Sequence, residues 1–253
     1  MKDGFVVTKN HGRIHYLEEG SGKPVILLQS NGNSAHEYAD MIPLLAKTRR
    51  VIAWDQPGQG DSDRITRHYT IQDYSNAVVE FMDALDLKTA SVLGSSIGGT
   101  ITIDLGVRHA SRIDSLFITE APIRTPEEWV KEWPRTERNW SYPIQTREEV
   151  APRLQKLTDE VFWRWNIDRQ KAGPWTMVDV MWAIREFDAA SAIKSIKTKT
   201  MVIFGLTNRL HGASSLYEKD LPSAKIVKMK DCGHFPMIDD PAGLTDLVDK
   251  FIG

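Results

Sequence analysis

The sequence has one cysteine, no cluster of basic residues and no long apolar run in its 253 residues. The single cysteine, Cys232, excludes an internal disulfide framework and favours a reducing compartment. A net charge of −2 without a basic block argues against a nucleic-acid partner. No segment approaches the length of a membrane span, and the first residues contain no apolar signal segment. These absences predict a cytoplasmic protein with neither nucleic acid nor membrane as partner.

Short apolar runs separated by segments of helical periodicity predict an α/β fold. The run Pro24–Gln29 is almost entirely apolar, which is typical of a parallel strand covered on both faces. Between Thr70 and Asp86 the apolar residues follow helical spacing, with Thr70 in the N-cap position and Asp73 three residues further on. We therefore expect a mostly parallel sheet of eight strands with helices on both faces. The predicted strands are Phe5–Thr8, Arg13–Glu18, Pro24–Gln29, Val51–Trp54, the run that starts at Ala90, Ile113–Thr119, Lys199–Phe204 and Ala224–Met229.

The alternation stops after Pro122, and residues 124–188 contain helical segments only. Seven of the eight tryptophans lie in this part of the chain. We predict a core domain made of residues 1–122 and 189–253, with residues 123–188 inserted as a helical cap. Some of the tryptophans are expected to pack the cap onto the core, while others line a large apolar pocket. Trp175 and Trp182, which come nearest the return to the core, are the predicted substrate contacts together with Pro122.

The stretch Gly94-Ser95-Ser96-Ile97-Gly98 follows a short apolar run and precedes a helical pattern. A strand that turns sharply into a helix with a serine at the apex is a nucleophile elbow. Glycines are needed there because side chains two positions before or after the serine would collide with the adjoining strand and helix. The simpler alternative is a glycine-rich turn with incidental serines. The strand before and the helix after favour Ser96 as a catalytic nucleophile.

A serine hydroxyl needs a positioned base, and His234 is the candidate because it follows the last predicted strand and is preceded by glycine. The base in turn needs a carboxylate that fixes its tautomer and stabilises the imidazolium. The loop after Phe204 is one natural position for this acid, but it offers Asn208 and no Asp or Glu between residues 205 and 217.

Glu120 ends the strand that follows the elbow helix, and neighbouring parallel strands bring their carboxyl ends together. We therefore predict a catalytic triad of Ser96, His234 and Glu120. The alternative for Glu120 is a carboxylate at the hinge of the cap. In this scheme Asn208 has no essential part, because an amide can orient the histidine ring but cannot neutralise it.

The loop Ser30–Ser34 after the strand Pro24–Gln29 can aim a backbone N–H at the place where negative charge develops. The predicted oxyanion-hole donors are the N–H groups of Ile97 and of Asn33 or Gly32. A plain strand-to-helix loop is the alternative. No cofactor and no metal is expected.

Along nearly its whole length the chain resembles the α/β-hydrolase superfamily. Asn31-Gly32-Asn33 looks like the oxyanion loop of that superfamily, with Asn31 where a histidine is usual, and Gly94–Gly98 and Gly233-His234 have its order and spacing. A glutamate after the sixth strand is similar to that of some haloalkane dehalogenases, which however need an aspartate nucleophile. The fungal zearalenone hydrolases, which are lactonases, are more similar: they combine a serine with a glutamate acid, and their stretch before the elbow strand looks like Asp83–Lys88.

The leading hypothesis is a serine hydrolase that cleaves a lactone or ester of a bulky, largely hydrophobic small molecule. The resemblance implies a zearalenone-type macrolactone. A second hypothesis is cofactor-free dioxygenase chemistry on a heteroaromatic ring, because some dioxygenases of this fold resemble the same layout. A third is a ligand receptor with little turnover. The sequence also leaves open a homodimer formed through apolar surface on the cap.

Overall fold

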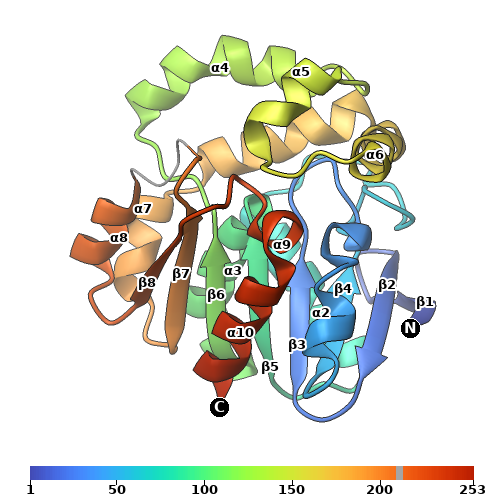
Figure 1. Ribbon diagram of the computed structural model, residues 1–253, viewed down its shortest axis with the longest axis vertical. Helices are drawn as coiled ribbons and strands as arrows, with labels where there is room; N and C mark the ends of the chain where they lie inside the picture. Colours follow the sequence, from blue (N-terminus) through green and yellow to red (C-terminus); the bar gives the residue numbers. More distant parts are fainter. Residues whose placement is uncertain (209–212) are drawn as a thin grey trace.

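The computed structural model describes residues 1–208 and 213–253, which form one eight-stranded sheet with helices around it (Figure 1). The strands are β1 (Lys2–Val7), β2 (Arg13–Gly20), β3 (Pro24–Leu28), β4 (Arg50–Trp54), β5 (Ala90–Ser95), β6 (Ile113–Thr119), β7 (Thr200–Gly205) and β8 (Lys225–Met229). Their order in the sheet is β1-β2-β4-β3-β5-β6-β7-β8. β2 is antiparallel to both of its neighbours, and all other pairs are parallel. The prediction of a mostly parallel, eight-stranded sheet is confirmed.

Helices cover both faces of the sheet, and the side chains of each strand alternate between the two faces. Ile26 and Leu28 of β3 pack in the cluster that contains α2 and α3, whereas Val25 and Leu27 pack in the cluster that contains α1 and α10. All four side chains are completely buried, as expected for a strand covered on both sides. The helices of this part are η1 (Ala35–Tyr38), α1 (Ile42–Leu45), α2 (Ile71–Ala84), α3 (Ile97–Arg108), η2 (Ala110–Arg112), α7 (Ala189–Ala192), η4 (Ile193–Ser195), α8 (Ser214–Asp220), α9 (Pro236–Asp239) and α10 (Pro241–Ile252).

The helices between β6 and α7 form a layer above the carboxyl ends of the parallel strands (Figure 1). They are α4 (Pro126–Trp140), α5 (Arg147–Val150), η3 (Ala151–Arg153) and α6 (Asp159–Glu186). Thr125 and Thr146 begin α4 and α5 with capping boxes that include Glu128 and Glu149. α6 is kinked at Gly173, whose φ of 77° is not helical and which precedes a proline. We call this layer the cap.

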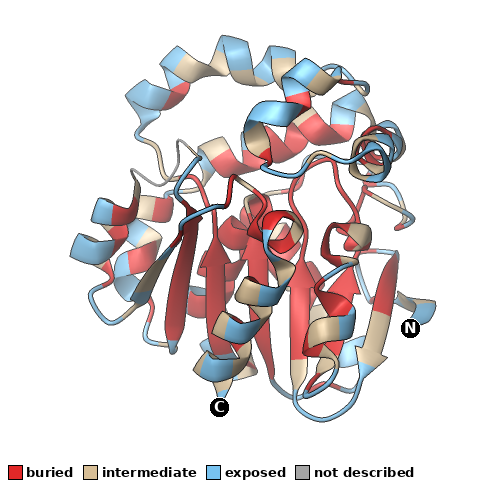
Figure 2. Ribbon diagram, in the orientation of Figure 1, coloured by how far each residue is buried: buried red, intermediate tan, exposed pale blue. Residues whose placement is uncertain are grey.

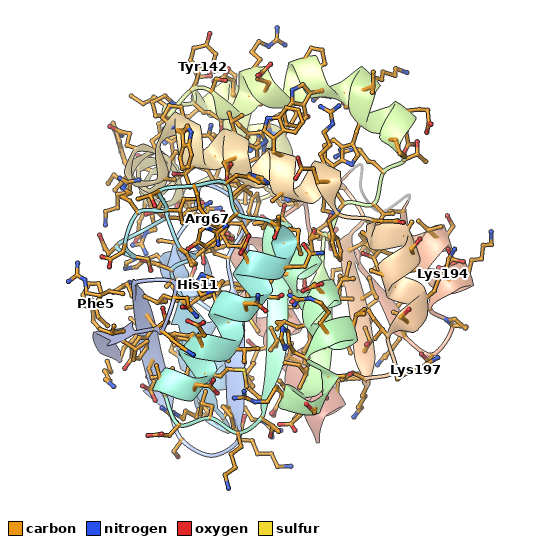
Figure 3. All side chains as sticks on the ribbon, turned by 180° about the vertical axis from the view of Figure 1, so that it is seen from behind. Phe5, His11, Arg67, Tyr142, Lys194 and Lys197 are labelled. Atoms are coloured by element: carbon orange, nitrogen blue, oxygen red, sulfur yellow. The ribbon has the colours of Figure 1, made fainter. Side chains whose placement is uncertain are left out.

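Polar contacts join the cap to the strands and loops beneath it. On the side shown in Figure 3, where Arg67 lies below the cap, the neighbouring His68 contacts Asp179 of α6 at 2.6 Å. In the half of α6 that precedes the kink, Asp168 accepts the hydroxyl of Ser34 at 2.8 Å. Figure 2 shows the central strands of the sheet buried, the edge strands β1 and β8 partly exposed and the outer surface of the cap largely exposed. The exact division into a core of residues 1–122 and 189–253 and a cap of residues 123–188 stays a prediction.

In the part of the chain that the structure describes, no helix combines the length and the apolar character that crossing a membrane requires.

Gly98 has no room for a side chain, because a Cβ would lie 2.2 Å from the carbonyl oxygen of Leu28. We expect Gly98→Ala to lower the free energy of unfolding by roughly 1–3 kcal/mol, since the backbones of β3 and α3 must separate. Urea unfolding followed by circular dichroism measures this change. Gly4→Ala is the matched control: its Cβ would meet the Tyr16 hydroxyl at an ordinary 3.4 Å, and we expect a change within about 1 kcal/mol. Equal losses in both variants would contradict the packing argument.

Candidate active site

Ser96 lies at the tip of a sharp turn between β5 and α3. Its φ of 55° and ψ of −111° are strained values for a residue with a side chain. The turn is held because the Ser96 N–H donates to the carbonyl of Thr119, the last residue of the neighbouring β6, at 2.8 Å. A Cβ on Gly94 would lie 2.0 Å from the carbonyl oxygen of Gly98, so the turn closes only with glycine there. The local geometry is that of a nucleophile elbow.

Glu120 follows β6 directly and is completely buried. It too has a positive φ, 53°, and its N–H donates to the carbonyl of Ile203 on β7. One carboxylate oxygen, Oε1, accepts the N–H of Gly205 at 2.6 Å. A buried carboxylate on a strained backbone is unlike an exposed hinge residue, and such strain gathers at functional sites.

His234 follows β8 and reaches Glu120 across the end of β7. Its Nδ1 lies 3.6 Å from Oε2 of Glu120, and its side chain is 17% exposed. The loop is anchored to the cap, because the His234 N–H donates to the carbonyl of Arg153 at 2.8 Å. The described hydrogen bonds include none between the Ser96 hydroxyl and the His234 ring, a bond that in enzymes often forms fully only in the substrate complex. The structure thus brings the predicted acid and base together, with Ser96 at the end of the adjoining strand.

Asn208 lies between the acid and the base. Its Nδ2 donates to Oε2 of Glu120 and lies 2.9 Å from Nδ1 of His234. The sequence argument gave Asn208 no essential part, whereas the structure gives it contacts to both partners. An amide N–H that donates to Nδ1 favours the histidine tautomer with its proton on Nε2. A protonated Nε2 cannot accept the proton of the serine hydroxyl. Catalysis through Glu120 therefore requires Asn208 to release Nδ1 to the carboxylate.

The predicted oxyanion loop contains two N–H groups that already have acceptors. Gly32, with a φ of 75°, donates to the side-chain oxygen of Gln59 at 2.8 Å. Asn33 donates to the carbonyl of Ser30 at a longer 3.3 Å. Ile97 is the first residue of α3, and the first N–H groups of a helix have no intrahelical acceptor. Of the three predicted donors, Ile97 and Asn33 are the more readily available.

Glu37, on η1, holds the oxyanion loop from the side of the sheet. Its Oε2 accepts the N–H of Ser30 at 3.0 Å, the hydroxyl of Ser30 at 2.6 Å and Nδ2 of Asn33 at 2.9 Å. Burial raises the pKa of Glu37 to about 7, although these hydrogen bonds act in the opposite direction. No motif in the sequence around Glu37 indicates this role, and the sequence analysis missed it.

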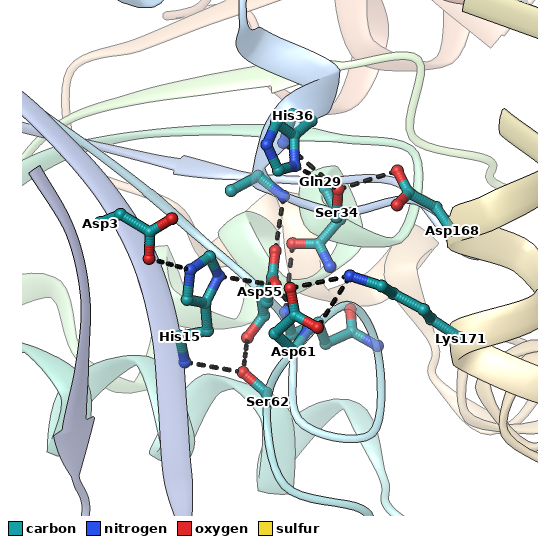
Figure 4. Close-up of polar contacts among 12 residues, drawn as sticks. Asp3, His15, Gln29, Ser34, His36, Asp55, Asp61, Ser62, Asp168 and Lys171 are labelled. Carbon is teal, nitrogen blue, oxygen red and sulfur yellow. Dashed lines mark hydrogen bonds and ion pairs between the residues drawn. The ribbon is translucent and has the colours of Figure 1, made fainter. Parts of the chain in front are cut away.

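A network of charged groups supports the same region (Figure 4). Asp55 holds the loop that follows β4: it accepts the N–H groups of Asp61 at 2.7 Å and of Ala35 at 2.6 Å. His15 lies between Asp55, at 2.8 Å, and Asp3, at 2.9 Å. Burial lowers the pKa of His15, but the hydrogen bonds and charges of these two acids outweigh it and raise the pKa to about 9.

Three side chains of this network, His15, Asp55 and Asp61, have potential metal-ligand atoms within 4.8 Å of one another. Each is already engaged, since His15 is bonded to two carboxylates and Asp61 to the Lys171 ammonium at 2.7 Å. These contacts describe a structural ion network.

The predicted substrate contacts are placed in different surroundings. Trp175 is 56% exposed, whereas Pro122 is buried next to Glu120. Trp182 packs against Trp133, with ring centres 4.2 Å apart. That Trp175, Trp182 and Pro122 contact the substrate stays a prediction.

Another ring of the cap, which the sequence did not single out, lies against the oxyanion loop. It is Trp140, whose Cζ3 would be 3.4 Å from a Cβ on Gly32.

A cavity of about 290 Å³ lies between η1 and the first half of α6. Its lining includes Asn33, Glu37, Trp165 and Asp168, and none of the three predicted triad residues lines it.

Comparisons with known proteins agree with this architecture. The family described as alpha/beta hydrolase fold matches residues 23–147. The chain is 26% identical over 255 residues to 2-hydroxymuconate semialdehyde hydrolase of Pseudomonas sp. (strain CF600), covering 95% of this chain and 90% of that protein. Two solved structures share the fold: the enol-lactonase from Burkholderia xenovorans LB400 (TM-score 0.79, 22% identity, 98% and 99% covered) and a thermophilic esterase from Thermogutta terrifontis (TM-score 0.85, 20% identity, 100% and 98% covered).

The chain therefore has the α/β-hydrolase fold, as the sequence predicted. The comparisons support a hydrolase as its class without specifying the bond that it cleaves. None of the three similar proteins named above is a zearalenone hydrolase, so that finer resemblance belongs to the proposal below.

Because the pKa of His15 is raised, the free energy of unfolding is expected to fall as the pH rises. The contribution of His15 is fully present below pH 6.5, the ordinary histidine value, and is lost as the pH rises to about 9. We expect the wild type to lose up to about 3 kcal/mol more than His15→Gln over this interval. Urea unfolding of both proteins at pH 6.5, 8 and 9.5 measures the difference. Parallel pH dependences would show that His15 is not charged in the folded protein.

Proposed function

We propose that this protein is a serine hydrolase that uses Ser96, His234 and Glu120 to cleave a lactone or carboxylic ester. The observation that carries the proposal is the buried Glu120 carboxylate 3.6 Å from Nδ1 of His234, at the strand end next to a strained Ser96. Acyl transfer needs a serine nucleophile, a histidine base and a carboxylate beside that base. The elbow serine, His234 and the buried Glu120 match these three parts.

The chemistry follows the roles of these groups. The Ser96 Oγ attacks the carbonyl carbon while His234 takes the hydroxyl proton, and the oxyanion forms beside the N–H groups of Ile97 and Asn33. The bond to the alcohol oxygen then breaks, and His234 returns the proton to that oxygen. Water attacks the acyl-serine by the same route and releases the acid. Glu120 accepts the Nδ1 proton and stabilises the imidazolium throughout.

The proposed substrate is a bulky, largely hydrophobic ester or lactone, with a zearalenone-type macrolactone as the first one to test. Aromatic rings support this choice, because Trp140 lies on the oxyanion loop and Trp165 packs against Phe235, the residue after the base. Names of similar proteins include a lactonase and an esterase. They also include a semialdehyde hydrolase and a meta-cleavage product hydrolase, so the choice of an ester bond is our proposal.

Replacing the nucleophile or the acid tests the proposal directly. We expect Ser96→Ala and Glu120→Gln each to lower kcat by about 10³- to 10⁴-fold on an aryl ester and on the macrocyclic lactone. Glu218→Gln, an exposed carboxylate on α8, is the matched control and should keep full activity. Oxygen consumption by an active Ser96→Ala variant would instead identify a dioxygenase. Ligand-induced stabilisation of the wild type without product would identify a receptor.

The contacts of Asn208 suggest a sharper test of the acid. Asn208 and Glu120 both reach His234, so Glu120→Gln combined with Asn208→Asp exchanges the amide and the carboxylate around the same ring nitrogen. We expect this double variant to recover at least about 10-fold of the kcat that Glu120→Gln loses. A double variant no more active than Glu120→Gln would show that a carboxylate at position 208 cannot serve the base.

A further inference from the structure

Two arginines of the cap share one tryptophan ring directly on the oxyanion loop. The guanidinium carbon of Arg169, on α6, lies 4.9 Å from the ring centre of Trp140, and that of Arg153, at the end of η3, lies 5.7 Å from the same centre. A Cβ on Gly32 would be 3.3 Å from Cγ of Arg169 and 3.4 Å from the Trp140 ring. The pair of cations is therefore next to the candidate oxyanion hole.

Arg153 is also attached to the base. Its carbonyl accepts the His234 N–H at 2.8 Å, so its backbone forms part of the histidine loop. Its guanidinium carbon lies 5.4 Å from the ring centre of Trp165, and that ring packs against Phe235. The backbone of Arg153 thus contacts the loop of the base, the side chain of Arg169 lies against the oxyanion loop, and both side chains meet on the Trp140 ring.

Neither guanidinium has a negative partner. Among residues 1–208 and 213–253, no carboxylate lies within 4.0 Å of Arg153 or Arg169. Arg169 is completely buried, and its Nε and Nη1 have no hydrogen-bond acceptor among the residues described. Only its Nη2 is bonded, to the carbonyls of Asn139 at 2.9 Å and of Tyr142 at 2.6 Å.

Both side chains nevertheless remain cations near neutral pH. Burial, together with the nearby charge of Arg153, lowers the pKa of Arg169 to about 9, and burial lowers that of Arg153 to about 10. Glu149 is the acid that acts on both, but it is exposed and its carboxylate accepts the N–H of Thr146. Arg169 is completely buried and Arg153 partly buried, and two like charges on one ring without a carboxylate partner among the described residues are costly.

A purely structural role explains part of this arrangement. Through its bonds to Asn139 and Tyr142, Arg169 ties α6 to the end of α4, and both arginines stack on Trp140. That role leaves Nε and Nη1 of Arg169 without acceptors and does not explain why a second cation shares the same ring. A carboxylate would supply both the acceptors and the charge, and guanidinium groups bind carboxylates with two parallel hydrogen bonds.

We propose that the substrate carries a carboxylate, separate from the carbonyl that is attacked, and that Arg153 and Arg169 bind it beside the oxyanion hole. This inference rests on the proposed function, because it assumes that the reacting carbonyl lies at Ser96. It replaces the neutral hydrophobic macrolactone as the expected substrate with an ester or lactone that carries a carboxylate.

Two esters that differ only at the far end of the acyl chain test the proposal. They are 4-nitrophenyl pentanoate, which ends in a methyl group, and the mono-4-nitrophenyl ester of glutaric acid, which ends in a carboxylate. We expect kcat/KM to be about 10- to 100-fold higher for the acidic ester. Arg153→Met and Arg169→Met should each remove most of this preference, and Arg153→Lys should keep part of it. Arg147→Met is the matched control, because Arg147 also stacks on an aromatic ring of the cap, that of Phe162.

Equal kcat/KM for the two esters in the wild type would overturn the inference. Arginine variants whose kcat/KM falls by the same factor on both esters would also overturn it, because an equal loss indicates a structural role. Arg169→Met removes the hydrogen bonds that join α6 to the end of α4, and this variant could fail to fold. In that case the result for Arg153→Met tests the proposal.

A binding measurement separates this inference from the proposed function. The amide analogues of the two esters, glutaramate and pentanamide, are compared by the thermal stabilisation that they give the wild type. We expect glutaramate alone to stabilise the protein, and Arg153→Met to abolish the effect. This result stands even if Ser96→Ala retains activity, which would refute the serine hydrolase and leave the anion site intact. Equal stabilisation by both amides would overturn the anion site.

Discussion

The site depends on burying the Glu120 carboxylate where β6 and β7 end. Removing this charge from water costs several kcal/mol, so its oxygens must receive hydrogen bonds. The register that pairs Thr119 with Ile203 provides one, because it brings the Gly205 N–H onto Oε1. The same register turns Oε2 toward the loop after β8 and hence toward His234. The parallel pairing of the last strands therefore determines where the acid meets the base.

The cap takes part in the same construction. The His234 N–H donates to the carbonyl of Arg153, and the hydroxyl of Ser34, the last residue of the oxyanion loop, donates to Asp168 of α6. The base and the oxyanion loop thus each have one partner in the cap. A displacement of α6 or η3 would move groups on both sides of the reacting carbonyl.

The parts of the fold with strong local constraints could be predicted from the sequence. β6 matches the predicted Ile113–Thr119, and the elbow was recognised because Gly94 and Gly98 tolerate no Cβ. The place of Glu120 near His234 could be predicted because Glu120 ends a strand next to the elbow, and its role as the acid stays a prediction. The roles of Glu37 and Asn208 could not be predicted, because each depends on side chains from distant loops that meet at the sheet edge. Periodicity and motif spacing carry no information about contacts between side chains of distant loops.

Charge is distributed unequally on the two sides of the oxyanion loop. On the sheet side lies the buried Glu37, and on the cap side lie Arg153 and Arg169. An ionised Glu37 would repel an oxyanion formed at this loop. The hydrogen bonds that Glu37 accepts from Ser30 and Asn33 therefore fix the conformation of the loop and do not stabilise the oxyanion. The proposed donors to the oxyanion are the N–H groups of Ile97 and Asn33. In the proposed site Arg153 and Arg169, which contact no carboxylate among the described residues, would add positive charge from the cap side.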